Sequence, residues 1–442
     1  MKKILTASTA LVAAGMITAG AADAADKIKI NVGGFSQWWV VGVWQDTKFQ
    51  NATNQANNNN LGLPAGTLTN GQNNAAQRAN VDIKGNNEIW FSGDTTLDNG
   101  MKVGVFVSLE AGGHSDILTD SIDKSYAWVE GGFGKVMLGT APNGTALLHV
   151  QAPDAANNFT NAGIMNANFA VSKPASVMGM NQIVGQSSSM NTTNIIADDN
   201  AEKITYVAPS FAGLTVGATY VPSVTRQDQR GTPLSRSEAF GGGAMYANTF
   251  GPVGVKLSGG YVWVDLSSSG AVGERAYTAQ SYGTQLSYAG FTLGGSVQLA
   301  RDDHKSGALS ASVLGSGANG TNGSATYGSA ANATYIAPGK GQIDFGGKAF
   351  DVGLQYASGP YAVSLAYFRS EVNGALTSTK KDLIEFYQAS GKYALGPGVD
   401  MLGSVGYAHY KDQRKGTLTT ALANDALENS GWTAMSGLSL AF

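Results

Sequence analysis

The sequence contains no cysteine among its 442 residues, which excludes disulfide cross-links, thiolate metal sites and cysteine nucleophiles. Charged residues are also few: they make up 13% of the chain, against roughly 25% in an ordinary soluble domain. Beyond the N-terminus no apolar run reaches the ~18 residues of a membrane-spanning helix, which excludes a polytopic helical protein. The formal net charge of −3 offers no basic surface for nucleic acid. Glycine is abundant, with 59 residues.

The N-terminus has the pattern of an export signal. Two lysines follow Met1, residues 4–20 are apolar and rich in alanine, and Ala22-Asp23-Ala24 supplies a small-x-small cleavage site. A membrane anchor is the alternative, but the stretch is short and no positively charged flank follows it. We therefore predict a secretory signal peptide over residues 1–24 and a mature chain of residues 25–442. An exported chain without cysteine fits a bacterial envelope.

Downstream, apolar and polar residues alternate with a period of two. Between Arg78 and Leu97, one face carries residues such as Lys84 and Glu88, and the other carries residues such as Ile83. Asp98-Asn99-Gly100 follows as a tight-turn signal, and alternation resumes over residues 101–110. This pattern predicts a long hairpin with one apolar face and one wet, charged face.

The same alternation recurs along the mature chain. One strand near 27–44, seven hairpins and a final strand near 431–442 make sixteen strands, with tight turns near residues 99, 133, 211, 251, 290, 359 and 397. Long polar segments separate the hairpins, at 45–77, 111–123, 140–202, 221–238, 265–280, 300–346, 369–382 and 410–430. We predict an all-β fold: a transmembrane antiparallel β-barrel of sixteen strands, with long outer loops and short periplasmic turns. Closure is required because lipid offers no partner to the polar groups of a strand edge.

Aromatic residues at strand ends support a membrane barrel, because tyrosine and tryptophan favour the bilayer interfaces. They are Trp44, Tyr220, Trp263, Tyr288, Tyr367, Tyr393 and Trp432. A soluble β-sandwich is the alternative, since it also has one core face and one wet face. The export signal, the strand count, the low charge and the apolar C-terminal strand together favour the barrel.

Five segments, in order, resemble the Gram-negative general porin family. They are residues 30–35 (INVGGF), 97–103 (LDNGMKV), 126–139 (YAWVEGGFGKVMLG), 204–214 (ITYVAPSFAGL) and the terminal Phe442. The resemblance covers essentially the whole mature chain. It implies a sixteen-stranded homotrimeric barrel in the outer membrane, in contact with lipid and lipopolysaccharide, through which small hydrophilic solutes diffuse. It also implies that the barrel-assembly machinery recognises Phe442.

The resemblance places residues 140–202 where the family has its inward-folded constriction loop. The predicted constriction residues are acids of this loop and cations of the first hairpin, namely Asp154, Asp198, Asp199, Glu202, Arg78, Lys84 and Lys102. Opposed charges of this kind would set up a transverse field that selects polar solutes. The alternative is that each is a solvated loop or wall residue. The loop lacks the Pro-Glu-Phe-Gly pattern of some family members.

Removing Lys2, Lys3 and Asp23 leaves a mature chain of 26 basic and 30 acidic residues, with a net charge of −4. Together with the acidic loop, this favours a mild preference for cations, which the wall lysines oppose. The charges at the narrowest point decide the outcome, because a cleft focuses the local field.

Other chemistry is not indicated. The four histidines, His114, His149, His304 and His409, lack metal-ligand spacing, and no hydrolase, zinc-protease or phosphate-loop motif occurs. We therefore predict a protein that is not an enzyme and needs no metal or cofactor. Three functions stay open: a passive diffusion porin, a solute-specific porin with a site in loop 140–202, and a structural or adhesive barrel with a plugged lumen.

Overall fold

The computed structural model describes residues 27–52, 80–112, 122–159, 170–174, 176–180, 192–195, 201–224, 238–265, 275–304, 343–375, 379–417 and 421–442. The sixteen strands are β1 (Lys29–Gln45), β2 (Val81–Thr96), β3 (Lys102–Glu110), β4 (Ile122–Gly131), β5 (Gly134–Gly139), β6 (Lys203–Val207), β7 (Leu214–Val221), β8 (Ala239–Phe250), β9 (Val253–Asp265), β10 (Arg275–Tyr288), β11 (Phe291–His304), β12 (Ile343–Ser358), β13 (Tyr361–Ala375), β14 (Asp382–Gly396), β15 (Val399–Lys411) and β16 (Glu428–Ala441). Among the described residues, α2 (Gly144–Leu147) and α6 (Ala421–Asp425) are short helices in loops, and residues 47–52 after β1 are also helical. None of the helices in these described ranges is long and apolar enough to cross a bilayer.

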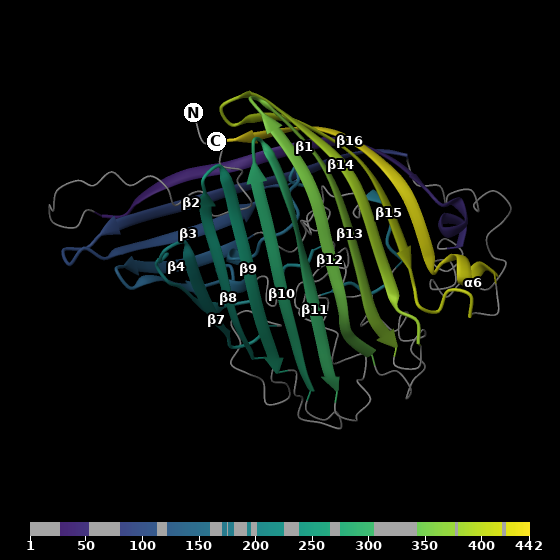
Figure 1. Ribbon diagram of the computed structural model, residues 1–442, viewed down its shortest axis with the longest axis horizontal. Helices are drawn as coiled ribbons and strands as arrows, with labels where there is room; N and C mark the ends of the chain where they lie inside the picture. The colour runs from purple at the N-terminus through teal and green to yellow at the C-terminus, as the bar shows by residue number, and fades with distance from the viewer. Residues whose placement is uncertain are drawn as a thin grey trace.

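The strands form one closed antiparallel barrel in which each strand pairs with its neighbours in sequence. The first and last strands close it: β1 pairs with β16 from Phe35↔Ala441 to Gln45↔Gly431, and the purple and yellow strands lie together in Figure 1. Beyond β16, the Gly34 N–H donates to the Phe442 carbonyl at 2.9 Å. The predicted all-β, sixteen-stranded transmembrane barrel is thereby confirmed, with long outer loops and short periplasmic turns.

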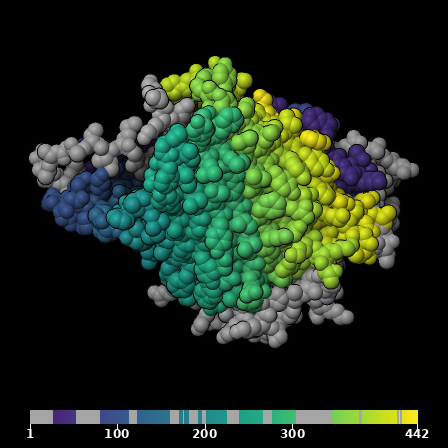
Figure 2. All heavy atoms as spheres, in the orientation of Figure 1, coloured from purple at the N-terminus to yellow at the C-terminus, as the bar shows by residue number. Residues whose placement is uncertain are grey.

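The alternation of the sequence becomes an outer and an inner face. Ile83 of β2 is 67% exposed on the outer face. Lys84, the next residue, faces the lumen and pairs with the inward Trp39 of the adjacent strand β1. Figure 2 shows the outer face over the later strands as a continuous surface. The seven strand-end aromatics predicted to form interfacial belts all lie on outward positions of the register, on β1, β7, β9, β10, β13, β14 and β16.

Several strands extend further toward the outer side than the alternation predicts. β13 continues to Ala375 and β16 begins at Glu428, so the predicted loops 369–382 and 410–430 are shorter in the structure. The reason is visible on β13, where Arg369 and Glu371 occupy outward positions beyond the apolar band. Polar residues on both faces hide the period of two once a strand leaves the lipid.

The inner face is not uniformly wet. Trp39, Val41 and Val43 of β1 point inward, and each is less than 10% exposed. They belong to an apolar cluster that includes Phe159 and Met180 of the long loop after β5. The expectation of a polar inner face thus holds for β2 but is wrong for this part of β1, because loop side chains cover it.

Candidate functional site: an inner loop against the channel wall

The long segment between β5 and β6 (residues 140–202, the inner loop) enters the barrel and begins its path along strands β7 to β10. The Gly144 N–H donates to Thr219 Oγ1 of β7 at 2.8 Å. The Val150 N–H donates to Ser258 Oγ of β9 at 2.9 Å. Gln285 Nε2 of β10 donates to the Gln151 carbonyl at 2.6 Å.

The loop then continues along strands β12 to β15. The Ala152 N–H donates to Asp351 Oδ1 at 2.8 Å, and the Ala155 N–H donates to Ser364 Oγ at 2.9 Å. Asn158 Nδ2 reaches Ser404 Oγ of β15 at 3.1 Å. Residues 144–158 therefore lie along one half of the inner wall, across the lumen from strands β2 to β4.

Inward glycines make room for this close contact. A Cβ on Gly283 would lie 1.8 Å from the Val150 carbonyl oxygen, and one on Gly243 would lie 2.8 Å from the Gly144 carbonyl oxygen. On Gly353 the corresponding distance, to the Pro153 carbonyl oxygen, is 3.0 Å. A side chain at these positions would push the loop toward the lumen, so the glycines help to set the width of the channel.

Asp154, a predicted constriction acid, is engaged by the loop itself. Its Oδ2 accepts from the backbone N–H groups of Asn158 at 2.6 Å and Phe159 at 3.0 Å, and its Oδ1 accepts from Ser364 Oγ at 3.1 Å. The carboxylate therefore tightens a turn of the inner loop and anchors it to β13. Its proposed part in the transverse field stays a prediction.

The distal part of the inner loop covers the outer end of the lumen near the seam. Phe159 stacks on Phe386 of β14 with ring centroids 5.2 Å apart. The Met178 N–H donates to Asp382 Oδ2 at 3.0 Å, and the Ser172 N–H donates to Gln45 Oε1 at 3.1 Å. Apolar packing and these hydrogen bonds hold the loop inside the barrel.

Two titratable residues of the inner loop, Lys173 and His149, are half-buried in this packing. Burial lowers the pKa of Lys173 to about 8, although Asp382 and Asp412 oppose the shift, and its Nζ donates to the carbonyls of Val177 and Pro174. Burial also lowers the pKa of His149 to about 4, so this imidazole is neutral at neutral pH. Both groups resist the charged form because the packed loop excludes water.

A short hydrogen-bonded chain fixes His149. Its Nε2 lies 3.1 Å from Thr193 Oγ1, and that hydroxyl donates to Asp351 Oδ2 at 2.8 Å. Ser296 Oγ lies against Thr193 Oγ1 and donates to the same Asp351 oxygen, so the three side chains form one connected network beside the imidazole. Asp351 thus joins two distant parts of the inner loop, at Ala152 and Thr193, to β12.

The remaining predicted site residues are dispersed. Lys84 faces the lumen from β2, with its Nζ 3.3 Å from Asp82 Oδ2, and Lys102 faces the lumen at the periplasmic end of β3. Glu202 is exposed just before β6. Arg78, Asp198 and Asp199 lie outside the described residues. The structure thus places two predicted cations on the wall opposite the loop, and their role in a constriction stays a prediction.

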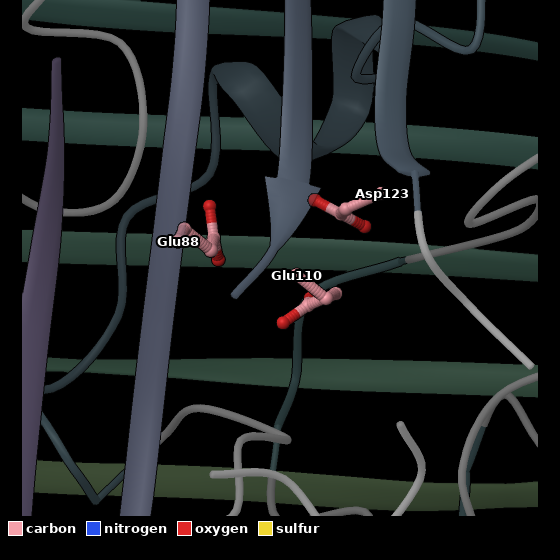
Figure 3. Close-up of side chains that lie close together, drawn as sticks. All are labelled: Glu88, Glu110 and Asp123. Carbon is pink, nitrogen blue, oxygen red and sulfur yellow. The ribbon is translucent and has the colours of Figure 1, made fainter. Parts of the chain in front are cut away.

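An inward acidic group was not anticipated. The carboxylates of Glu88, Glu110 and Asp123, from β2, β3 and β4, have oxygens within 4.8 Å of one another (Figure 3). Lys124 Nζ lies 2.8 Å from Asp123 Oδ1 and offsets part of the charge. The alternation of the sequence places Glu88 on the wet face of the first hairpin, but Asp123 falls within a predicted loop, 111–123.

Comparison with known proteins agrees with this architecture. A family model described as Gram-negative porin matches residues 7–413. The anion-selective porin from Comamonas acidovorans has the same fold, with a TM-score of 0.58 and 15% identity over 94% of this chain and 100% of that one. The outer membrane channel DcaP of Acinetobacter baumannii has a TM-score of 0.55 and 12% identity, over 95% of this chain and 98% of that one. The trimer form of OmpT from Vibrio cholerae has a TM-score of 0.51 and 10% identity, over 95% of this chain and 100% of that one. No curated protein matches the chain significantly.

Proposed function

The chain belongs to the Gram-negative porin family, and from this premise we propose that solutes cross between the inner loop and the facing wall of strands β2 to β4. It is an outer-membrane β-barrel channel for the passive diffusion of small hydrophilic solutes. The family indicates a channel rather than an enzyme. The observation that carries the route is the inner loop, whose described hydrogen bonds to the wall between Gly144 and Asn158 run to β7, β9, β10 and β12 to β15. The opposite wall therefore borders the remaining lumen.

Planar-bilayer recording tests this function. Purified protein should insert as discrete steps with an ohmic current, and proteoliposomes should swell in small sugars. A tight seal without steps, or the absence of swelling, would contradict the open channel and favour a plugged barrel. If large and small sugars caused swelling at the same rate, the channel would not be narrowed by the inner loop.

A homotrimer is supported by the outer face of β1 and β2. Ser36 and Asn87 form a hydrogen-bonded pair on outward positions, and Asn87 Nδ2 also donates to the Gly112 carbonyl at 2.7 Å. Asn87 is only 7% exposed, whereas Ser36 is half-buried, so Ser36 supplies the polar surface at this outward position. A polar group is costly in lipid, so a second protomer is a better neighbour for it. Ser36→Leu should weaken the trimer measured by native mass spectrometry, whereas Ser92→Leu, an inward change on the neighbouring strand β2, should leave it intact.

Lipopolysaccharide contact is supported on the outer-leaflet side of β12 to β16. Outward aromatic rings form a row there, with Tyr367 and Tyr387 4.6 Å apart and Tyr407 and Trp432 5.1 Å apart. Charged side chains lie just beyond the row, including Arg369, whose guanidinium is 2.7 Å from Glu385 Oε1. Lipid acyl chains would pack below the row and phosphates would meet cations above it. The amount of copurifying lipopolysaccharide should fall in Arg369→Gln and stay unchanged in the inward Ser370→Ala.

The two ends of the chain complete the proposal. Phe442 is 66% exposed and its ring lies against Gly34, at the seam of the barrel. An exposed aromatic terminus is available to the assembly machinery, so Phe442→Ala should lower the outer-membrane level of the protein in cells but not its refolding in detergent. Cleavage after Ala24 should give a mature N-terminus at Ala25 by mass spectrometry.

A further inference from the structure

The wall opposite the inner loop carries a row of inward aromatic rings that the strand-end belts do not include. We call Phe35, Trp90, Phe106, Tyr126 and Trp128 the lumenal aromatic strip. The register places all five on the inner face: Trp90 pairs with Gly33, Phe106 with Tyr126, and Trp128 with Gly104. They come from four consecutive strands, β1 to β4, so the strip runs obliquely across one side of the lumen.

The two indoles of the strip lie flat against the wall. A Cβ on Gly33 would be 2.4 Å from Nε1 of Trp90, and one on Gly104 would be 2.5 Å from the indole of Trp128. Each tryptophan therefore covers a glycine on the preceding strand and stays half-buried on the inner face of the barrel. Lys135 Nζ lies 4.1 Å from the centre of the Trp128 ring.

The rings of the strip also support one another. Phe35 and Trp90 have centroids 6.1 Å apart, and Phe106 stacks on Tyr126 at 5.2 Å with 27° between the planes. Such pairs hold large apolar surfaces in fixed orientations.

Trp39 provides the internal comparison, because its ring also lies over a glycine of the neighbouring strand, Gly437. Trp39 is only 1% exposed, and it packs with loop residues such as Met178 in the apolar core. The rings of the strip are half-buried, and they lie on strands that the described hydrogen bonds of loop residues 144–158 do not reach. A tryptophan over a glycine thus packs in the apolar core at Trp39, whereas in the strip it remains part of a half-buried aromatic surface.

Groups that form strong hydrogen bonds border the strip on both sides, and both signs of charge are present. Toward the outer side lie Glu88, Glu110 and the Asp123–Lys124 pair. Toward the periplasm, Lys135 Nζ lies 3.7 Å from Glu130 Oε2. Acids and ammonium groups side by side do not select one ionic sign, but they offer both acceptors and donors to hydroxyl groups.

These features together match the chemistry of a sugar ring. A pyranose has faces of C–H bonds, which are attracted to the negative face of an aromatic ring, and a rim of hydroxyls that donate and accept hydrogen bonds. We propose that the lumenal aromatic strip is a binding track for neutral sugars, and that it makes the channel sugar-preferring. The proposal rests on the proposed diffusion function and adds a solute class to it.

Single-channel recording with maltotriose as the probe tests the track. Maltotriose should block the ion current in a saturable way, whereas sorbitol, a polyol without a ring, should not. Trp90→Ala and Phe106→Ala should each raise the half-blocking concentration about tenfold, as expected from the loss of one aromatic contact. Trp90→Phe should restore most of the block. Trp38→Ala, a change of a lipid-facing tryptophan on β1, is the matched control and should have no effect.

The outcomes separate the two proposals. If the wild type gives no conductance steps, the diffusion function itself fails. If the steps are normal but maltotriose and sorbitol act alike, or the block is unchanged in Trp90→Ala and Phe106→Ala, the sugar track is wrong and the channel is not. If arginine blocks at lower concentration than maltotriose and the same variants abolish that block, the strip binds organic cations and the proposal is overturned. Step conductance in each variant shows that the barrel has folded.

Discussion

The carbonyl oxygen of Val150 occupies the space that a side chain on Gly283 would need, since a Cβ built there lies 1.8 Å from that oxygen. Residue 150 belongs to the inner loop and residue 283 to β10, so this single contact couples the channel width to the wall. Backbone oxygen cannot yield as the end of a flexible side chain does. The loop therefore stays close to the wall only while position 283 is glycine.

Gly283→Ala is expected to move the inner loop toward the lumen, because the methyl group and the Val150 carbonyl cannot share the same space. The free energy that holds the loop in its docked position should fall by about 1–3 kcal/mol, as in other overpacked sites. Single-channel conductance should fall or become noisy. Gly259→Ala is the matched control. Gly259 occupies an outward position on β9, and a Cβ there would lie 3.7 Å from Tyr282. If Gly283→Ala and the wild type had equal conductance, the contact between the wall and the loop would not determine the width of the channel.

Asp154→Asn is expected to loosen the loop more than it changes ion selectivity. The carboxylate accepts two backbone N–H groups and a serine hydroxyl, and replacing such a capping acceptor costs about 1–2 kcal/mol. Current noise should therefore rise, while the reversal potential in a salt gradient should change little.

Lys84→Met is the complementary change, since it removes an inward cation and should shift the reversal potential toward cation preference. A large selectivity change in Asp154→Asn with no change in Lys84→Met would reverse these assignments.

The half-buried Lys173 predicts that the docked loop becomes more stable at alkaline pH. Its pKa falls from 10.5 to about 8 when the loop is docked, so between about pH 8 and 10.5 the undocked state binds the extra proton. The docked state gains stability as pH rises through this window, and it carries the full burial cost below pH 8. Melting in detergent should show this rise, and Lys173→Met should remove it. A slope of the opposite sign would mean that Lys173 is held charged by Asp382 and Asp412.

The barrel follows from the sequence because a lipid-facing strand must alternate, and the first hairpin shows it: Ile83 lies outside and Lys84 inside, as predicted. The inner-loop path does not follow from alternation. Gly283 and Gly353 occupy inward positions, where a polar residue and a glycine look equally acceptable until the loop is seen against them. Trp90 was missed for the same reason: a period of two fixes the face of a residue, but it does not distinguish an aromatic ring that lines a channel from one in a core.

His149 predicts acid loosening of the same loop, with the opposite pH direction from Lys173. Its docked pKa is about 4 against an ordinary 6.5, so between these values only the undocked state binds the proton. The docked state therefore loses stability as pH falls from about 6.5 to about 4. The protonated ring carries an N–H on both nitrogens, and Nδ1 has no hydrogen-bond partner among the described residues. Closing or flickering events should become more frequent in this window in wild-type recordings. His149→Gln, which keeps one N–H for Thr193 but cannot titrate, should give a flat profile. If the two proteins flicker alike at pH 5, the acid response arises elsewhere in the barrel.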